Sequence, residues 1–153
     1  MQYFEDISVG ETHEFGSYEV TEEEIISFAE QYDPQPFHTD PEAAEESFFG
    51  RLVASGWHTA AITMRLIVDH RSDDIAALGA KGLDDLRWRQ PVFPGDVLSV
   101  RTEVVEKRAD HADRGELRTR TETLNQNGDV VLSYVTIPMV ARRTEGAEST
   151  EDV

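Results

Sequence analysis

The feature that most constrains the fold is a change of hydrophobic period halfway along the chain. Apolar side chains occur nearly all round the helical positions of residues 56–68, which predicts a buried helix. Residues 97–104 and, more weakly, 117–124 then alternate apolar and polar side chains, as half-buried strands do. Residues 130–137 are apolar enough for a central strand. One long apolar helix against a largely antiparallel sheet predicts an α+β fold.

Capping signals place the elements of the first third of the chain. A first strand is expected within Thr12–Val20. Thr21 is predicted to be the N-cap of a helix ending near Tyr32, with the Glu24 side chain reaching back in a capping box. Asp40-Pro41 is typical of an N-cap followed by proline in the first helical position, which predicts a short helix over 41–47.

Turn residues delimit the later strands. Pro94-Gly95-Asp96 marks a turn, and a strand over 86–93 is expected before it. Asn127-Gly128 predicts a hairpin between the last two strands. The expected order is strand, helix, loop, buried helix and four strands. It predicts a single domain over residues 1–141, followed by an acidic, disordered tail over 142–153.

The composition excludes several classes of protein. The chain has 153 residues, which favours one domain, and no cysteine, which excludes disulfides, thiolate catalysis and cysteine-ligated metals. His13, His70 and His111 are scattered and show no metal-ligand spacing. We expect neither a metal nor another cofactor. No apolar run resembles a signal peptide or a membrane span, so the sequence predicts a cytoplasmic protein.

The charge is strongly negative. Fourteen basic residues against 31 acidic ones give −17, and only Lys81 and Lys107 are lysines. This balance argues against nucleic acid or an anionic membrane as a partner. We interpret it as adaptation to a high-salt cytoplasm, where screening reduces self-repulsion. The alternative is an ordinary acidic protein, since net charge bears on solubility rather than fold.

The segment Asp33–His38 holds the strongest candidates for chemistry. It contains two prolines, which disfavour the α region for Asp33 and Gln35 and predict a rigid, extended loop rather than a helical turn. A carboxylate and an imidazole held in this way can deprotonate a water molecule or exchange a proton with a substrate. The alternative is that Asp33 is a turn residue and His38 a hydrogen-bonded loop residue.

The start of the 56–68 helix is a second candidate. Ser55 is predicted to be its N-cap, and the free N–H groups of a helix start favour a developing negative charge such as an enolate or thioester oxyanion. Gly56 lets a ligand approach the backbone closely. Every buried helix begins somewhere, so this signal counts only if the helix start faces the Asp33–His38 segment.

The remaining candidates are more ambiguous. His58 is interpreted as a packed core histidine rather than a proton-transfer group. Arg87 and Arg89 lie either on an exposed strand face or against a phosphate. Phe37 and Trp57 are expected in the core or in a pocket wall.

Residues 28–59 resemble the MaoC-like dehydratases, also called the R-specific enoyl-CoA hydratases. The matching residues, in order, are Phe28-Ala29, Asp33, Pro36, His38, Asp40, Phe49-Gly50 and Ala54-Ser55-Gly56. Downstream, Gln90-Pro91-Val92 and Pro94-Gly95-Asp96 match the family's following strand and turn. The resemblance covers about a hundred residues, in order and at suitable spacing.

The resemblance implies a hotdog fold, in which the sheet wraps around the long helix. It implies a homodimer or higher homo-oligomer with active sites near the subunit interface. It also implies an α,β-unsaturated acyl-CoA thioester substrate. Asp33 and His38 would be the catalytic dyad that activates water and donates a proton at the α carbon, the Gly56 N–H would polarise the thioester carbonyl, and Ser55 would line the site.

Two positions depart from the family pattern. Tyr32 and Gln35 stand where the family usually has glycine and asparagine. Gln35 keeps the amide that orients the dyad, and Tyr32 is expected to narrow the pocket or alter its entrance. Straight, branched and dicarboxylic acyl groups all remain open. The alternatives to a hydratase are a hotdog acyl-CoA thioesterase and a non-catalytic acyl-CoA-binding subunit.

Overall fold

The computed structural model describes residues 1–71 and 75–143. A short 3-10 helix, η1 (Phe4–Asp6), precedes strand β1 (Thr12–Glu19) and three helices, α1 (Glu22–Tyr32), α2 (Pro36–Thr39) and α3 (Pro41–Glu45). The long helix α4 (Gly56–Arg71) follows. Four strands complete the described chain: β2 (Ala77–Trp88), β3 (Val97–Arg108), β4 (Arg114–Leu124) and β5 (Val130–Ala141). The predicted order of elements is therefore confirmed.

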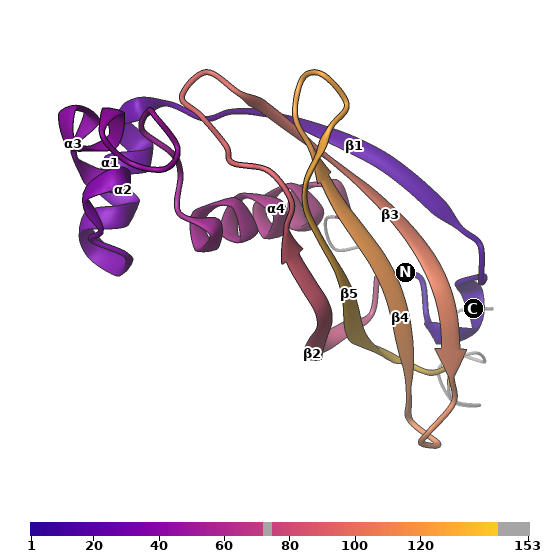
Figure 1. The fold of residues 1–153 in the computed structure, drawn as a ribbon. Helices are drawn as coiled ribbons and strands as arrows, with labels where there is room; N and C mark the ends of the chain where they lie inside the picture. The colour runs from indigo at the N-terminus through magenta and orange to yellow at the C-terminus, as the bar shows by residue number, and fades with distance from the viewer. Residues whose placement is uncertain (72–74, 144–153) are drawn as a thin grey trace.

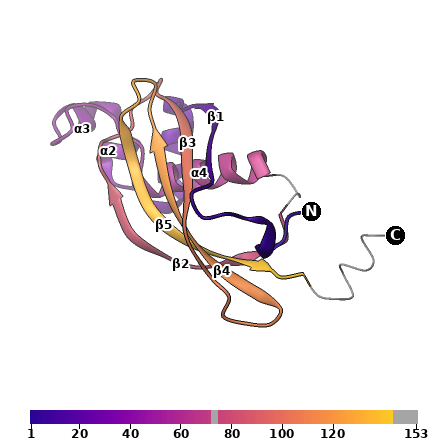
Figure 2. The ribbon, with the colours of Figure 1, turned by 90° about the vertical axis from the view of Figure 1, so that its right-hand side faces the viewer.

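The five strands form one antiparallel sheet in the order β1-β3-β4-β5-β2. The sheet curves around α4, while α1, α2 and α3 gather at the end where α4 begins (Figures 1 and 2). The core lies between sheet and helix, where Ile62 and Leu66 of α4 pack with strand residues such as Leu98 and Leu132. This is the hotdog arrangement that the sequence predicted.

A polar contact also joins α4 to the sheet within this core. The hydroxyls of Thr63 and Thr123 are 2.6 Å apart and fully buried. Burying a hydroxyl without a partner is costly, so the two threonines satisfy each other where either alone would destabilise the packing.

Two helix starts follow the predicted capping. The Thr21 hydroxyl accepts a hydrogen bond from the Glu24 N–H at 3.2 Å, and the Asp40 carboxylate accepts from the N–H groups of Glu42 and Ala43. The predicted reciprocal bond from Glu24 is wrong. Its carboxylate instead meets Tyr18 of β1 and His58 of α4.

The segment after Asp33 differs from the predicted loop. Pro36–Thr39 forms one helical turn, with Pro36 in its first position and Gln35 extended before it at φ −88°, ψ 144°. The prolines do exclude the helix for the residues preceding them, but proline itself is well suited to begin one. Asp33, at φ −153°, ψ 65°, is not fully extended, because its N–H still bonds to Ala29 and closes α1.

The strand before the Pro94 turn begins and ends earlier than predicted. β2 spans Ala77–Trp88 instead of residues 86–93. Its glycines and aspartates have low strand propensity and hide it in the sequence. Three register irregularities against β5 accommodate them, with φ 110° at Gly79 and φ 55° at Asp85. An edge position tolerates such bulges.

Helix α4 is buried on one side only within a single chain, so the prediction of complete burial is wrong. Trp57, Met64 and Val68 are exposed on it, and Leu83 and Trp88 are exposed on the neighbouring strand β2. Sequence periodicity alone cannot separate a helix buried by its own sheet from one that a second chain would help to cover.

The predicted tail starts with two residues that are held in place. Arg142 forms an ion pair with Glu5, and Arg143 with Asp6, both acidic residues of η1. The remainder of that predicted tail, residues 144–153, lies outside the described residues.

Candidate active site

Three side chains converge on the carboxylate of Asp33, which directly follows α1. One oxygen, Oδ1, accepts a hydrogen bond from the Gln35 amide at 2.6 Å. The other, Oδ2, accepts from the Ser55 hydroxyl at 2.7 Å and lies 3.4 Å from Nε2 of His38. Gln35, Ser55 and His38 thus hold the carboxylate in one orientation, as the sequence predicted for a positioned acid and base.

The backbone fixes the tautomer of His38. Its Nδ1 lies 2.7 Å from the carbonyl oxygen of Val53, and a carbonyl can only accept a hydrogen bond. Nδ1 therefore keeps its hydrogen and donates it. Nε2 is left as the nitrogen that gains or loses a proton, and it is the one that faces Asp33.

The pKa of Asp33 is set by opposing effects. Burial alone would raise it, but the hydrogen bonds from Gln35 and Ser55 and the nearby His38 outweigh burial and lower the pKa of the carboxyl group. Asp33 is therefore ionised at neutral pH. Its contribution to stability is complete above the ordinary pKa of aspartate and is lost as the pH falls through the lowered pKa of the folded state.

The start of α4 meets this pair. Ser55 is fully buried, and its hydroxyl both donates to Asp33 and accepts from the Trp57 N–H at 3.3 Å. Among the described residues, no hydrogen bond involves the Gly56 N–H. A free N–H at the positive end of a helix can stabilise an anionic oxygen.

A cavity of about 360 Å³ joins these groups. Asp33, His38 and Gly56 all border it. Its walls are largely apolar and aromatic, and include Phe37, Phe49, Trp57 and Trp88. The arrangement provides a polar floor for proton transfer beneath a wall suited to an apolar group.

Two predicted binding residues lie elsewhere. Tyr32 is 70% exposed and borders a separate hollow of about 550 Å³ between α1 and α4, together with Glu24 and His58. It does not line the cavity above Asp33 in this chain. Arg87 does not border that cavity either, and its guanidinium donates to the Leu86 carbonyl.

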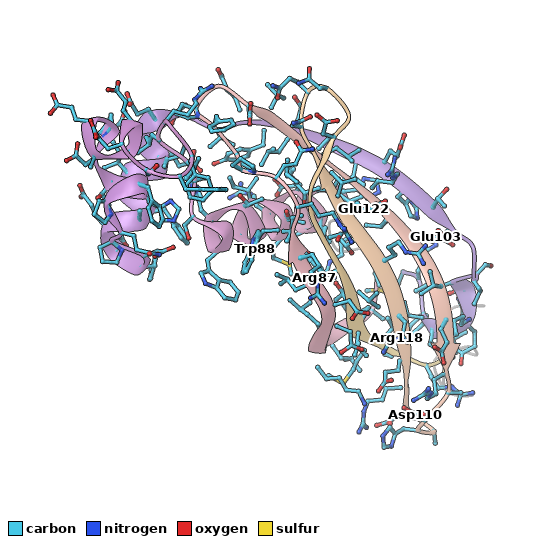
Figure 3. All side chains as sticks on the ribbon, in the orientation of Figure 1. Arg87, Trp88, Glu103, Asp110, Arg118 and Glu122 are labelled. Carbon is cyan, nitrogen blue, oxygen red and sulfur yellow. The ribbon has the colours of Figure 1, made fainter. Side chains whose placement is uncertain are left out.

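Arg89 borders the cavity, but its Nε donates to the Ser133 hydroxyl at 2.7 Å. Arg87 is paired with Ser133 across the β2–β5 ladder, and Trp88 is paired with the buried Leu132. Successive residues of a strand point to opposite faces, so Trp88 faces the helix side (Figure 3) and Arg87 faces away.

Sequence reasoning missed two parts of the site. The Val53 carbonyl that fixes His38 is a backbone group with no sequence signal. Trp88 lies directly over Gly56: a Cβ built on that glycine would be 2.4 Å from Cε2 of the indole. The alternation of residues 86–88 identifies Trp88 as facing inward, but nothing local indicates that it reaches the start of α4.

Within residues 1–71 and 75–143, no group of three metal-binding side chains comes together. No helix of that part of the chain is long and apolar enough to cross a membrane.

Comparisons with known proteins match this architecture. A family model described as a MaoC like domain matches residues 6–127. The crystal structure of the MaoC-like dehydratase from Rhodospirillum rubrum is 42% identical, with a TM-score of 0.85 over 94% of this chain and 99% of that one.

Two curated relatives are more distant. The 3-hydroxybutyryl-CoA dehydratase of Methylorubrum extorquens is 32% identical over 68% of this chain and 64% of its own length. The mesaconyl-CoA hydratase of Cereibacter sphaeroides is 40% identical over 46% of this chain, which spans 21% of that protein. With its domain match, its fold and the arrangement around Asp33 and His38, this chain belongs to the MaoC-like dehydratase family.

Proposed function

We propose that this protein is a hydratase/dehydratase that reversibly adds water to an α,β-unsaturated acyl-CoA thioester. The observation that carries the proposal is the pair Asp33 and His38, with Oδ2 and Nε2 3.4 Å apart in a cavity that also contains the Gly56 N–H. An acid–base pair and a separate oxyanion donor are what the addition of water to an enoyl thioester requires.

In the hydration direction, Asp33 and His38 bind the attacking water together. Nε2 of His38 takes one proton while the remaining hydroxide adds to the β carbon. The electron pair of the double bond moves to the thioester oxygen, where the Gly56 N–H stabilises the enolate. His38 then returns its proton to the α carbon, so that one water has been added and both residues are restored.

The hydrogen bonds around the dyad support this division of roles. The Asp33 carboxylate, with its lowered pKa, remains an acceptor that orients water. The Val53 carbonyl directs the reactive nitrogen of His38 toward the cavity. The aromatic wall excludes bulk water from the acyl chain.

The direct test follows crotonyl-CoA under the purified protein at high potassium chloride, with enoyl absorbance and free thiol recorded in parallel. Loss of enoyl absorbance without thiol is expected. Release of thiol would replace the proposal with a thioesterase. Branched and dicarboxylic enoyl thioesters extend the same assay, and binding without conversion of any of them would indicate a non-catalytic acyl-CoA-binding subunit.

The exposed apolar surface supports a homodimer. Met64 on α4 and Leu83 on β2 are both exposed, and β2 is the edge strand next to β5. Edge pairing of two β2 strands would cover both surfaces and remove an open sheet edge. Light scattering should give twice the chain mass, and Leu83→Lys should shift it toward the monomer. A monomeric wild type would contradict this arrangement.

Salt should strengthen substrate binding. CoA is an anion and the chain carries −17, so the KM for the CoA thioester is expected to fall as potassium chloride rises from 0.1 M to 1 M, where the screening length drops from about 10 Å to about 3 Å. The uncharged N-acetylcysteamine thioester of the same acyl group is the control. A KM that rises steadily with salt for the CoA substrate alone would contradict this prediction.

A further inference from the structure

A second polar network lies behind the catalytic cavity and takes no part in the proposed chemistry. The carboxylate oxygen Oε1 of Glu24, on α1, accepts the Tyr18 hydroxyl at 2.5 Å and Nε2 of His58 at 2.9 Å. Tyr18 comes from β1 and His58 from the first turn of α4. Three elements distant in the sequence are thus joined at one oxygen atom.

The burial of His58 indicates that this contact is specific. The residue is 3% exposed and stacks on Phe28 with ring centroids 4.6 Å apart. Among the described residues its Nδ1 is buried without a hydrogen-bond partner. A side chain chosen only to fill space would not bury an unpaired nitrogen there, so the bond from Nε2 to Glu24 must offset that cost.

The donor roles follow from the same geometry. An ionised Glu24 can only accept, so Tyr18 donates its hydroxyl hydrogen and His58 donates from Nε2. The hydrogen bond with Glu24, with burial adding to it, raises the pKa of Tyr18 to about 12, which keeps the phenol protonated as a donor. A neutral His58 avoids burying a second N–H without an acceptor.

The network acts on the part of α4 that the reaction needs. Helix α4 is attached to α1 at two points: Ser55 bonds to Asp33 beyond the last turn of α1, and His58 bonds to Glu24 in its first turn. At about 1.5 Å per residue these points are about 13 Å apart along α1. One attachment would let the helix start pivot, whereas two fix its direction.

We infer that Tyr18, Glu24 and His58 are positioning residues for the reaction, which set the first turn of α4 so that the Gly56 N–H points at the thioester oxygen. This rests on the proposed function. The three side chains act through the backbone of α4 and touch no substrate. Glu24 is the centre of the network because both donors meet its single oxygen.

Glu24→Gln and Glu24→Leu form a matched pair. Glutamine keeps Oε1 as an acceptor for both donors, while leucine keeps the bulk and removes the acceptor. We expect Glu24→Gln to stay close to wild type, and Glu24→Leu to lose about 10-fold or more in kcat with little change in KM, since misplacing a catalytic group by about 1 Å can cost ~10²-fold.

A second readout needs no turnover. In ¹H–¹⁵N spectra, the backbone amide of Gly56 should shift or broaden in Glu24→Leu and remain near its wild-type position in Glu24→Gln. Thr63→Val, which removes the buried hydroxyl contact to Thr123 further along α4, controls for general loss of stability. It should lower the melting temperature without moving the Gly56 signal or kcat.

The inference is overturned if Glu24→Leu keeps both kcat and the Gly56 signal, if Glu24→Gln falls as far as Glu24→Leu, or if Thr63→Val reproduces the leucine variant. A wild type that converts no thioester would remove the proposed function instead. The Gly56 amide signals would then decide alone whether the network holds the start of α4.

Discussion

Replacing either member of the dyad, by Asp33→Asn or His38→Asn, is expected to lower kcat by a factor of about 10² to 10⁴, the range in which positioned acids and bases contribute. Asparagine at position 33 can still meet Gln35 and Ser55 but lacks the charge that orients water. Asparagine at position 38 can still donate an N–H toward the Val53 carbonyl but carries no titrating nitrogen. Steady-state hydration of the enoyl thioester measures both.

Two controls accompany these variants. Asp40→Asn makes the same change of carboxylate to amide at the N-cap of α3, where asparagine caps about as well as aspartate, so activity should persist. The double variant of Asp33 and His38 should lose little more than either single variant, because residues that act as a unit are not additive. Near-normal turnover in either single variant would remove the dyad from the mechanism.

Local signals predicted most of the fold because short-range chemistry decides it here. The caps at Thr21 and Asp40 and the hairpin at Asn127-Gly128 are satisfied by neighbouring backbone groups, and all three lie at the predicted places. The strand β2 was misplaced because its stability comes from the ladder with β5, and its own residues Gly79 and Gly82 favour no strand.

The site divides in the same way. Asp33 and His38 lie close together in the sequence on a proline-stiffened segment, so their approach was predictable. The partners that tune them were only partly so: the start of α4 could be predicted to face the dyad, but the Val53 carbonyl and the Trp88 ring could not. Those contacts depend on how the sheet wraps α4, which no local pattern encodes.

The Tyr18–Glu24–His58 network shows how local rules compete. The sequence favoured a capping box at Glu24, and a carboxylate in the first turn of a helix is favourable there in any case. The fold brings two stronger donors, Tyr18 and His58, to the same oxygen, and the side chain turns to them instead of its own N-cap.

The second large effect is expected from Gly56→Ala. The added methyl group would lie 2.4 Å from Cε2 and 2.5 Å from Nε1 of Trp88, closer than such atoms approach. Either the indole or the first turn of α4 must move. Overpacking of this kind costs about 1 to 3 kcal/mol of stability, and loss of an aligned oxyanion donor lowers kcat by a factor of about 10² to 10³.

A rescue experiment separates crowding from any other role of the glycine. Trp88→Leu in the Gly56→Ala background removes the clashing ring, so kcat should recover toward that of Trp88→Leu alone. Gly82→Ala is the matched control, since a Cβ there meets nothing within 4 Å. If Gly56→Ala keeps wild-type kcat, or if removing the indole restores nothing, the contact between Trp88 and Gly56 does not define the helix start, and the oxyanion donor must be sought elsewhere around the cavity.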